Sequence, residues 1–256
     1  MKTFKTENWP SNLLTYDHVI ENDTTLINHL RDLRDEMVTA YPQAPSVRTI
    51  IPEFKPRVAV DLGANFGLFS AVIGRHFSEV HAFEASTFLS EMAAIFPRVE
   101  FLGANYGKIL KVYNLAASDK SGDVIELYKS NTTDPGDSSI FMNKETPDAP
   151  AERCFTIALP DIFKLIGHDY IDYMKIDIES AEYPFLMNQD LSQIGCIFME
   201  LHKSLSEDYT EKALLKHISK YMNMFRLPHD PIIWCFNKSY EINESPSWSV
   251  AGPPDS

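Results

Sequence analysis

The sequence predicts an α/β protein in which helices flank both faces of a mostly parallel sheet. Short apolar runs alternate with helical segments from about residue 57 onward. A glycine-containing loop follows the first of these runs, and charged residues stand at the ends of two later runs. Because the carboxyl ends of parallel strands meet at one edge of a sheet, the loop and the charged residues are expected at the same edge.

The first half of the chain predicts one helix followed by a strand-helix-strand unit. Leucines at three- and four-residue steps predict an amphipathic helix from Asn22 to Tyr41, which ends before Pro42. Further on, an apolar run stopped by glycine predicts a buried strand, and the segment after it predicts a helix packed on the sheet. The predicted elements are strands at Arg57–Gly63, Glu79–Glu84 and Lys111–Ala116 and helices at Gly67–Phe77 and Thr87–Phe96.

The second half predicts an antiparallel excursion and then a return to parallel strands. Two of its strands are separated by a polar, turn-rich loop from Asn131 to Pro150. The predicted strands are Asp123–Leu127, Arg153–Ile157, Ile171–Ile178, Cys196–Leu201 and Ile232–Phe236, and the predicted helices are Asp161–Ile166, Ala181–Met187 and Asp208–Met224. We therefore expect an N-terminal helical extension (1–50), one Rossmann-like domain (51–243) and a loosely ordered C-terminal tail (244–256) rich in Pro and Ser.

Composition excludes several classes of protein. Of the 256 residues, 44% are hydrophobic and 23% are charged, which is typical of a folded globular chain. The net charge of −13 disfavours nucleic acid and anionic lipid as partners. Three distant cysteines fit reduced thiols better than a disulfide framework, and no apolar run approaches the length of a membrane span. These observations favour a cytoplasmic protein without a membrane segment.

The loop Asp61–Gly67 predicts a cofactor site. It joins a strand to a helix, and its glycines would let the backbone approach a ligand that carries an anionic group. Asn65 stands where a dinucleotide fingerprint requires glycine, which makes NAD less suitable than a cofactor without a pyrophosphate. Glu84 closes the next predicted strand and is placed to accept hydrogen bonds from two ribose hydroxyls. The alternative is that the loop is only a structural strand-to-helix turn.

S-adenosylmethionine satisfies this set of residues. Its carboxylate suits the backbone between Gly63 and Gly67, its ammonium suits an acceptor such as Asp61, and its adenine is expected near Ala117–Asp119. The predicted cofactor-binding residues are Asp61, Gly63, Asn65, Gly67, Glu84, Ala117, Ser118 and Asp177.

A second polar group is predicted at the ends of two later strands. Side-chain alternation along a strand places Lys175, Asp177 and Glu179 on one face. By the same alternation Glu200 and His202 lie on one face at the end of the next strand. Burying polar side chains in a sheet that helices cover on both faces costs free energy, unless these side chains are paired or reach the edge where ligands bind. Structural alternatives remain for each residue. Lys175 can pair internally with an acid, Glu179 and Glu182 can cap the following helix, and Glu200 and His202 can be ordinary hydrogen-bonded residues.

These motifs resemble the FkbM-type family of S-adenosylmethionine-dependent methyltransferases. The resemblance covers Arg57 to His202, over half of the chain, and rests on DLGANFGLFS (61–70), FEAS (83–86), NLAASDKSG (114–122), MKIDIESAE (174–182) and MELH (199–202). It implies a class I, seven-stranded Rossmann-like methyltransferase fold and methyl transfer to oxygen, commonly on sugars or secondary metabolites. Ser180 departs from the glycine that the family usually has at that position, and the first fifty residues match no motif.

If the acceptor is an alcohol, a base must take its proton as the new bond forms. We hypothesise that His202, with a pKa near neutral, takes it, while Asp177 or Glu200 orients the imidazole or the acceptor hydroxyl. The predicted catalytic residues are thus His202, Asp177 and Glu200. No metal is required by this hypothesis, although Asp177, Glu179, Glu200 and His202 offer ligands for Mg²⁺ or Mn²⁺ in a metal-assisted variant.

Other functions compatible with the sequence are a non-catalytic Rossmann-like binding module, a nicotinamide dehydrogenase and an RNA ribose 2′-O-methyltransferase using Lys175 and Asp177. The dehydrogenase lacks an obvious Tyr-x-x-x-Lys pair, and the net charge disfavours RNA. We expect a small-molecule or glycan acceptor bound by the loop 131–150 and the N-terminal helix. The acceptor's identity and the oligomeric state are not specified by the sequence.

Overall fold

A computed structural model describes residues 57–74, 77–97, 109–128, 151–226 and 231–240, all within one compact unit of the chain. The predicted N-terminal helix, the loop 131–150 and the C-terminal tail lie outside the described residues, so the domain boundaries remain predictions.

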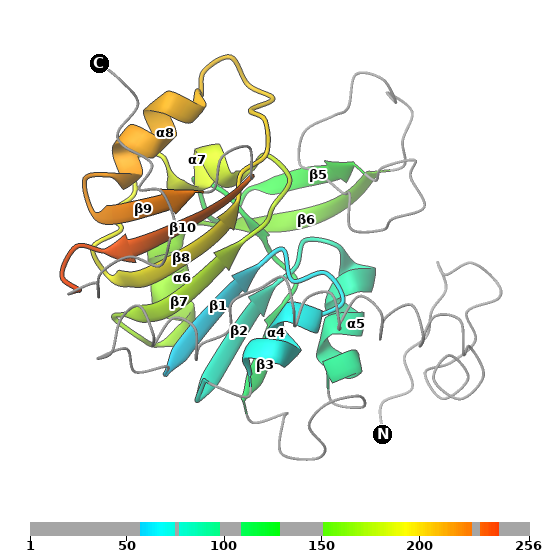
Figure 1. Cartoon of the computed structure of the whole chain (residues 1–256). Coiled ribbons are helices and arrows are strands. Elements are labelled where there is room, and N and C mark those ends of the chain that lie inside the picture. The colour runs from blue at the N-terminus through cyan, green and yellow to red at the C-terminus, as the bar shows by residue number, and fades with distance from the viewer. Residues whose placement is uncertain (1–56, 75–76, 98–108, 129–150, 227–230, 241–256) are drawn as a thin grey trace. The chain divides into compact units, whose positions relative to one another are not determined.

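The main sheet has seven strands in the order β3-β2-β1-β7-β8-β10-β9 (Figure 1). Its strands are β1 (Val58–Leu62), β2 (Glu79–Phe83), β3 (Leu110–Tyr113), β7 (Ile171–Ile176), β8 (Ile194–Glu200), β9 (Met222–Arg226) and β10 (Ile232–Asn237). Only β10 runs antiparallel to its neighbours, so the predicted mostly parallel sheet is confirmed. The chain moves outward from β1 to β3 and then restarts at β7. The boundary between β1 and β7 is therefore the topological switch point, where open α/β sheets bind ligands.

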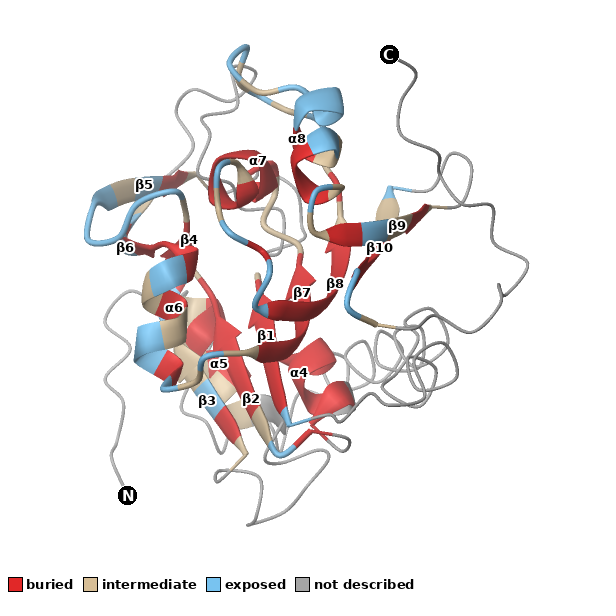
Figure 2. Cartoon of the chain, turned by 90° about the vertical axis from the view of Figure 1, so that its left-hand side faces the viewer, coloured by how far each residue is buried: buried red, intermediate tan, exposed pale blue. Residues whose placement is uncertain are grey.

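Five helices connect these strands in the described part of the chain: α4 (Leu68–Ile73), α5 (Thr87–Pro97), α6 (Leu159–Ile166), α7 (Glu182–Leu186) and α8 (Glu211–Ile218). Helices α4 and α6 lie on opposite sides of the sheet (Figure 2). Among the described helices, none combines the length and the apolar character needed to cross a membrane.

A smaller sheet of three strands follows β3 in the chain. It consists of β4 (Ala116–Ala117), β5 (Val124–Tyr128) and β6 (Ala151–Ile157), with β6 in the middle. Strands β5 and β6 pair antiparallel, which confirms the predicted excursion.

The core is formed where the central strands are covered on both faces. Every residue of β1 and β7 is buried, as their nearly continuous apolar sequences predict. On one face Phe69 of α4 stacks against Tyr173 and Phe198, with ring centroids 6.2 Å away in both cases. The cysteines Cys154, Cys196 and Cys235 are free and buried in this structure, in agreement with the prediction of unpaired thiols.

Two predicted elements are wrong in extent. The predicted strand Lys111–Ala116 is divided between the two sheets, because Asn114 turns the chain and donates hydrogen bonds to the carbonyls of Glu84 and Ala85. The predicted long helix Asp208–Met224 ends at Ile218. The remaining residues form β9, which pairs with β10 through backbone hydrogen bonds.

Replacing Gly63 by Ala should destabilise the fold strongly. Gly63 has φ +71°, and a Cβ atom there would lie 1.7 Å from the carbonyl oxygen of Asp177, so both strain and a backbone clash result. We expect a loss of about 3 kcal/mol or more in the free energy of unfolding, measured by urea denaturation.

The matched control for this variant is Gly122→Ala. Gly122 has φ +85°, but a Cβ atom there meets no described atom within 4 Å. Only the cost of the left-handed conformation applies, which is about 1–2 kcal/mol. Equal losses in the two variants would contradict the proposed clash.

Candidate functional site

The loop after β1 is fastened to the end of β2. The N–H groups of Gly63 and Ala64 both donate to the carbonyl of Phe83, at 3.0 and 3.1 Å. The N–H of Asn65 donates to Oε2 of Glu84 at 2.8 Å, and the N–H of Gly67 donates to the carbonyl of Ala64. The N–H groups of Gly63, Ala64, Asn65 and Gly67, four of the five in the segment predicted to receive a ligand carboxylate, are therefore engaged inside the protein. The next donors along the chain belong to the first turn of α4, which has no preceding helical turn to accept them.

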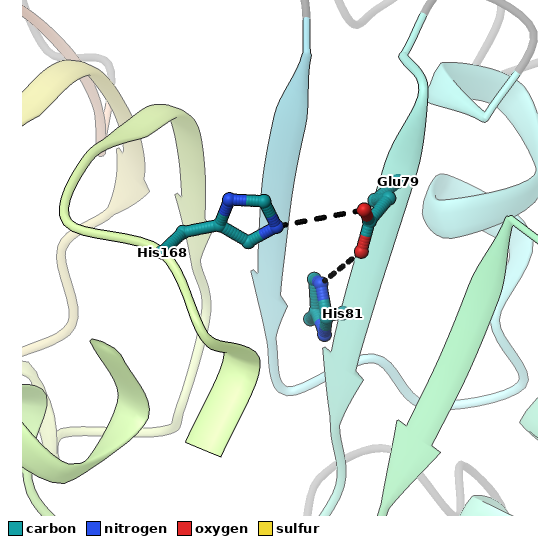
Figure 3. A group of neighbouring side chains, drawn as sticks. All are labelled: Glu79, His81 and His168. Atoms are coloured by element: carbon teal, nitrogen blue, oxygen red, sulfur yellow. Dashed lines mark hydrogen bonds and ion pairs between the residues drawn. The ribbon is translucent and has the colours of Figure 1, made fainter. Parts of the chain in front are cut away.

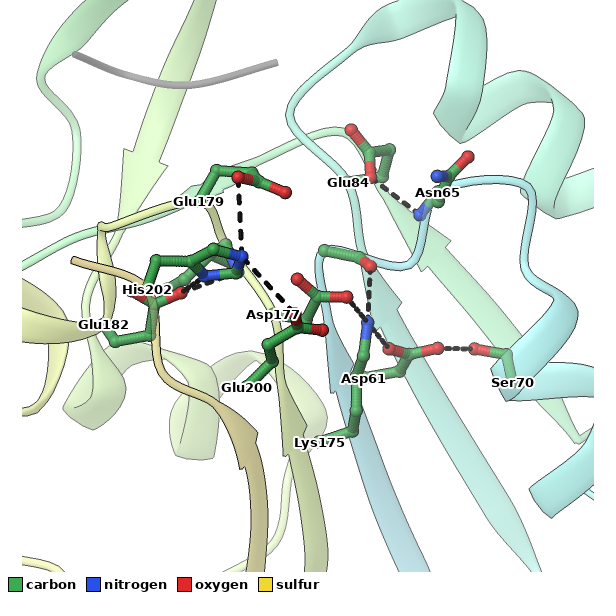
Figure 4. A network of polar contacts seen from close by, with 12 residues as sticks. Asp61, Asn65, Ser70, Glu84, Lys175, Asp177, Glu179, Glu182, Glu200 and His202 are labelled. Carbon is green, nitrogen blue, oxygen red and sulfur yellow. Dashed lines mark hydrogen bonds and ion pairs between the residues drawn. The ribbon is translucent and has the colours of Figure 1, made fainter. Parts of the chain in front are cut away.

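Glu84 is a buried carboxylate at the carboxyl end of β2, as predicted (Figure 4). Oε1 accepts a hydrogen bond from the N–H of Ser86 at 2.9 Å, and Oε2 accepts the one from Asn65. Burial raises the pKa of Glu84, while these two backbone hydrogen bonds oppose the shift. Each carboxylate oxygen has two lone-pair sites, so Glu84 can still accept hydrogen bonds from a ligand.

Lys175 connects the two strands at the switch point. Its Nζ donates to the carbonyl of Gly63 at 2.8 Å and lies 3.1 Å from Oδ2 of Asp177 and 3.6 Å from Oδ1 of Asp61. The ammonium also lies 5.8 Å from the centre of the Phe69 ring. The structural alternative for Lys175, internal pairing with an acid, is thus what the structure contains.

The two aspartates paired with Lys175 differ in exposure. The Asp61 side chain is fully buried, whereas that of Asp177 is 28% exposed. Oδ2 of Asp61 accepts a hydrogen bond from the Ser70 hydroxyl at 2.6 Å. Burial raises the pKa of Asp61, although the charge of Lys175 and the hydrogen bond from Ser70 oppose this. Oδ1 of Asp61 is buried and has no hydrogen-bond partner among the described residues, and Asp177 is the more exposed member of the pair.

His202 lies among carboxylates at the end of β8. Its Nδ1 is 3.0 Å from Oε1 of Glu182, and its Nε2 is 3.5 Å from Glu179 and 3.9 Å from Glu200. Burial alone would lower the pKa of His202, but the hydrogen bond to Glu182 and the charges of Glu182 and Glu179 raise it to about 9. The expectation of a near-neutral pKa is therefore wrong. The residue that orients the ring is Glu182, and neither Asp177 nor Glu200 does so.

The connection between β7 and α7 positions these groups. Glu179 and Ser180 both have positive φ angles, +52° and +77°. The Ser180 hydroxyl donates to the carbonyl of Lys203 at 2.9 Å. Oε1 of the fully buried Glu182 also accepts from the N–H of Ile178 at 3.1 Å, in the connection before α7. The predicted capping role is not confirmed, because no side-chain cap hydrogen bond is made at Ala181, the N-cap residue of α7. Ser180 thus adopts the conformation that favours glycine, the residue which the family usually has there.

The structure brings together only part of the predicted site. Asp177, Glu200 and His202 offer ligand atoms within 4.8 Å of one another, a spacing that could also hold a metal ion. Ala117 and Ser118 lie instead at the edge of the smaller sheet, where the N–H of Ser118 donates to the carbonyl of Ile157.

Asn114 and Glu182 were not among the predicted site residues, although both stand inside motifs quoted for the family resemblance. Asn114 donates to the Glu84 carbonyl, and Glu182 contacts the His202 ring. Both contacts join segments far apart in the sequence, so they can be recognised only in the folded structure. The sequence signal available for each was its position inside one of those motifs, since Asn114 falls within a predicted strand and Glu182 within a predicted helix.

The fold is that of a methyltransferase-like α/β protein. Its marks are the mostly parallel sheet, the glycine loop at the switch point and the acidic residue after β2. Residues 61–226 match the model of the Methyltransferase FkbM domain, which is more than half of the chain. The chain belongs to this family, as its motifs predicted.

Similar proteins include AmbE, an AMB antimetabolite synthetase of Pseudomonas aeruginosa, which is 27% identical over 176 residues. The match covers 57% of this chain and 8% of AmbE, so this chain spans a small part of that relative. Among solved structures, methyltransferase FkbM of Methylobacillus flagellatus KT is 15% identical with a TM-score of 0.44, covering 71% of this chain and 44% of that one. Magnesium protoporphyrin IX methyltransferase of Synechocystis PCC 6803, solved with bound SAM, is 9% identical with a TM-score of 0.41, covering 82% and 79%.

Replacing Lys175 by Met should destabilise the fold, because the buried Asp61 carboxylate loses its cation. We expect a loss of about 3–5 kcal/mol in the free energy of unfolding at pH 7. The double variant Lys175→Met with Asp61→Asn removes the uncompensated charge and should regain part of this loss, as measured by urea denaturation.

Lys164→Met serves as the control for this pair. Lys164 pairs with Asp161 at 2.7 Å, but its side chain is 76% exposed, so a change within about 0.5 kcal/mol is expected. A Lys175→Met variant as stable as the wild type would show that the buried pair is not what holds the switch point.

Proposed function

We propose that this protein methylates a hydroxyl oxygen on a small molecule or glycan. The observation that carries the proposal is the buried Glu84 carboxylate, held by the Asn65 and Ser86 N–H groups at the same sheet edge as His202. The cofactor, when bound, supplies an electrophilic methyl group on a charged sulfur. The task left to the protein is to hold the acceptor in line, exclude water and move a proton.

Glu84 accepts hydrogen bonds from the two ribose hydroxyls in this proposal. Oδ1 of Asn65 supports the fit, since this atom is buried and has no hydrogen-bond partner among the described residues. A donor-bearing ligand at the loop would satisfy it. We assign the ligand carboxylate to the first turn of α4 and the amino group to Asp177, which is exposed enough to reach it. Asp61 acts through Lys175 and Ser70 to hold the loop, with Gly63 and Gly67 supplying its left-handed turns.

Ala117 and Ser118 remain the residues proposed to contact adenine. The smaller sheet that contains them is fastened beside the end of β2, because Glu152 of β6 accepts hydrogen bonds from the N–H of Thr87 at 2.8 Å and the hydroxyl of Ser86 at 3.4 Å. This sheet is therefore held next to Glu84, which supports the proposal that its residues contact adenine.

His202 is the proposed base for the acceptor proton, oriented by Glu182. The raised pKa means that the ring is charged at neutral pH and accepts a proton only after it has lost one. Asp177 and Glu200 are proposed to bind the acceptor hydroxyl beside Nε2. A metal held by Asp177, Glu200 and His202 is an alternative way to lower the hydroxyl pKa, and full activity in the presence of a chelator would rule it out.

The acceptor class is supported by the family and by the likeness to part of a protein named for antimetabolite synthesis, which favours a biosynthetic small molecule. The RNA alternative needs Lys175 at the acceptor, and Lys175 is buried against Gly63, Asp61 and Asp177. A methyl-transfer screen over sugars, lipids and phenols tests the proposal. Cofactor binding without transfer to any hydroxyl would instead favour the non-catalytic binding module.

Replacing Glu84 by Gln should weaken cofactor binding about 10- to 100-fold, since hydrogen bonds to a charged group contribute about 1.5–3 kcal/mol. The amide also presents an N–H group toward a backbone donor, Asn65 or Ser86. Calorimetric titration with S-adenosylmethionine measures the change. Glu126→Gln, on the exposed part of β5, is the control and should bind normally. Equal affinities in both variants would remove Glu84 from the site.

Turnover should rise with pH toward a midpoint near 9, because only neutral His202 accepts the proton. Glu182→Gln should move this midpoint down, since it removes the main group that raises the pKa. His202→Ala should reduce turnover and abolish the rise while leaving cofactor affinity nearly intact. A pH profile that is the same with and without His202 would exclude it as the base.

The same shift affects folding with a defined sign. The pKa of His202 in the folded state lies above its unfolded value of about 6.5, so the charged ring stabilises the fold below that pH. This contribution is lost as the pH rises through about 9. Rates should therefore be compared with far-UV circular dichroism at each pH, so that unfolding is not mistaken for titration of the base.

A further inference from the structure

A second group of ligand-type side chains lies at the opposite end of the main sheet from the cofactor edge. Glu79 begins β2 and His81 follows two residues later on the same face. His168 comes from the connection between α6 and β7 and points toward them (Figure 3). The proposed methyltransferase site uses none of these three residues.

We propose that Glu79, His81 and His168 bind a divalent first-row transition metal ion such as Zn²⁺. Nε2 of His81 lies 3.2 Å from Oε2 of Glu79, and Nε2 of His168 lies 3.5 Å from Oε1 of the same carboxylate. Ligands bound tetrahedrally at about 2.0–2.1 Å from zinc stand about 3.3–3.4 Å apart. Each imidazole thus already lies at nearly the distance from a Glu79 oxygen that such an ion imposes, and one ligand atom from each of the three side chains lies within 4.8 Å of the others.

The chemistry of the group favours a transition metal over Mg²⁺ or Ca²⁺. Two imidazoles and one carboxylate are a ligand set that zinc uses in sites with one open position, whereas the harder ions prefer oxygen. Nδ1 of His81 lies 3.1 Å from the Tyr113 hydroxyl, a contact that fixes the ring from its far side. Metal-binding histidines are commonly held by such a second contact.

Access to the site is also suitable. The His81 side chain is fully buried, while those of His168 and Glu79 are 34% and 33% exposed. An ion can therefore enter from solvent and leave its fourth position to water. Once bound, it would link the start of β2 to the α6–β7 connection, two segments far apart in the sequence.

Lys111 is the competitor for this position. Its Nζ lies 3.2 Å from Oε2 of Glu79, and its side chain is 51% exposed. The lysine neutralises the carboxylate in the absence of an ion and can swing into solvent when one binds. Lys111 and a metal ion therefore compete for Glu79, which would not be so if the cluster were only structural. Removing Lys111 should make metal binding tighter.

The test uses the full chain, freed of metal with a chelator and titrated with Zn²⁺ by calorimetry and with Co²⁺ by visible absorption. We expect one ion per chain, a tetrahedral Co²⁺ spectrum and a higher melting temperature with zinc. His168→Ala should weaken binding at least tenfold, and Lys111→Met should strengthen it several-fold. His81→Ala is unsuitable, because His81 is buried and the variant can fail to fold.

Glu200→Gln is the matched control, because it alters the other described group that could hold a metal, Asp177, Glu200 and His202. Binding that survives Glu200→Gln and is lost in His168→Ala supports the proposal. Three results would overturn it: no zinc uptake by the wild type, equal affinity in wild type and His168→Ala, or loss of the ion in Glu200→Gln alone. Because cofactor titration is a separate measurement, failure here leaves the proposed methyltransferase function unaffected.

Discussion

The site depends on one buried cation at the switch point of the sheet. Asp61 of β1 and Lys175 of β7 are register partners on adjacent strands. The lysine ammonium contacts the Asp61 carboxylate, the Gly63 carbonyl and Asp177, so it fixes the loop after β1 and the end of β7 against each other. Because the chain diverges in opposite directions from these two strands, no continuous segment could fix that geometry. A charged group that is costly to bury is tolerated here because its partners are supplied by β1 and by the residues that directly follow β1 and β7.

The strands of the main sheet were predictable because burial on both faces demands continuous apolar runs, as in β1 and β7. The predicted bounds were wrong where hydrogen bonds to a distant segment determined the secondary structure. Residues 222–226 contain apolar residues at helical spacing, yet they form an edge strand because β10 offers backbone partners. Asn114 ends β3 because its side chain finds carbonyls from another strand end. In both cases a tertiary interaction outweighed local propensity, and no local pattern contains that information.

The membership of the site was more predictable than the role of each residue. Side-chain alternation and the positions of the strand ends predicted one edge of the sheet for Glu84, Asp177, Glu200 and His202. These positions follow from the order of strands alone. Burial then separated residues of similar chemistry. Asp61 is enclosed and holds the loop, whereas Asp177 is exposed enough to meet a ligand. The pKa of His202 was not predictable, because it depends on burial and on the carboxylates of Asp177, Glu179 and Glu182, which only the folded chain brings beside the end of β8.

The position of His202 is determined from the β7–α7 connection rather than from its own strand. Glu182 holds the ring, the Tyr183 hydroxyl donates to the His202 carbonyl at 2.8 Å, and Ser180 donates to the next carbonyl, that of Lys203. The positive φ of Ser180 costs about 1–2 kcal/mol relative to glycine, and its hydrogen bond returns about 0.5–1.5 kcal/mol. Serine is therefore nearly neutral at this position and adds a contact that glycine cannot make. The substitution keeps the turn that aims Glu179 and Glu182 at the imidazole, and it further restrains the segment that carries the proposed base.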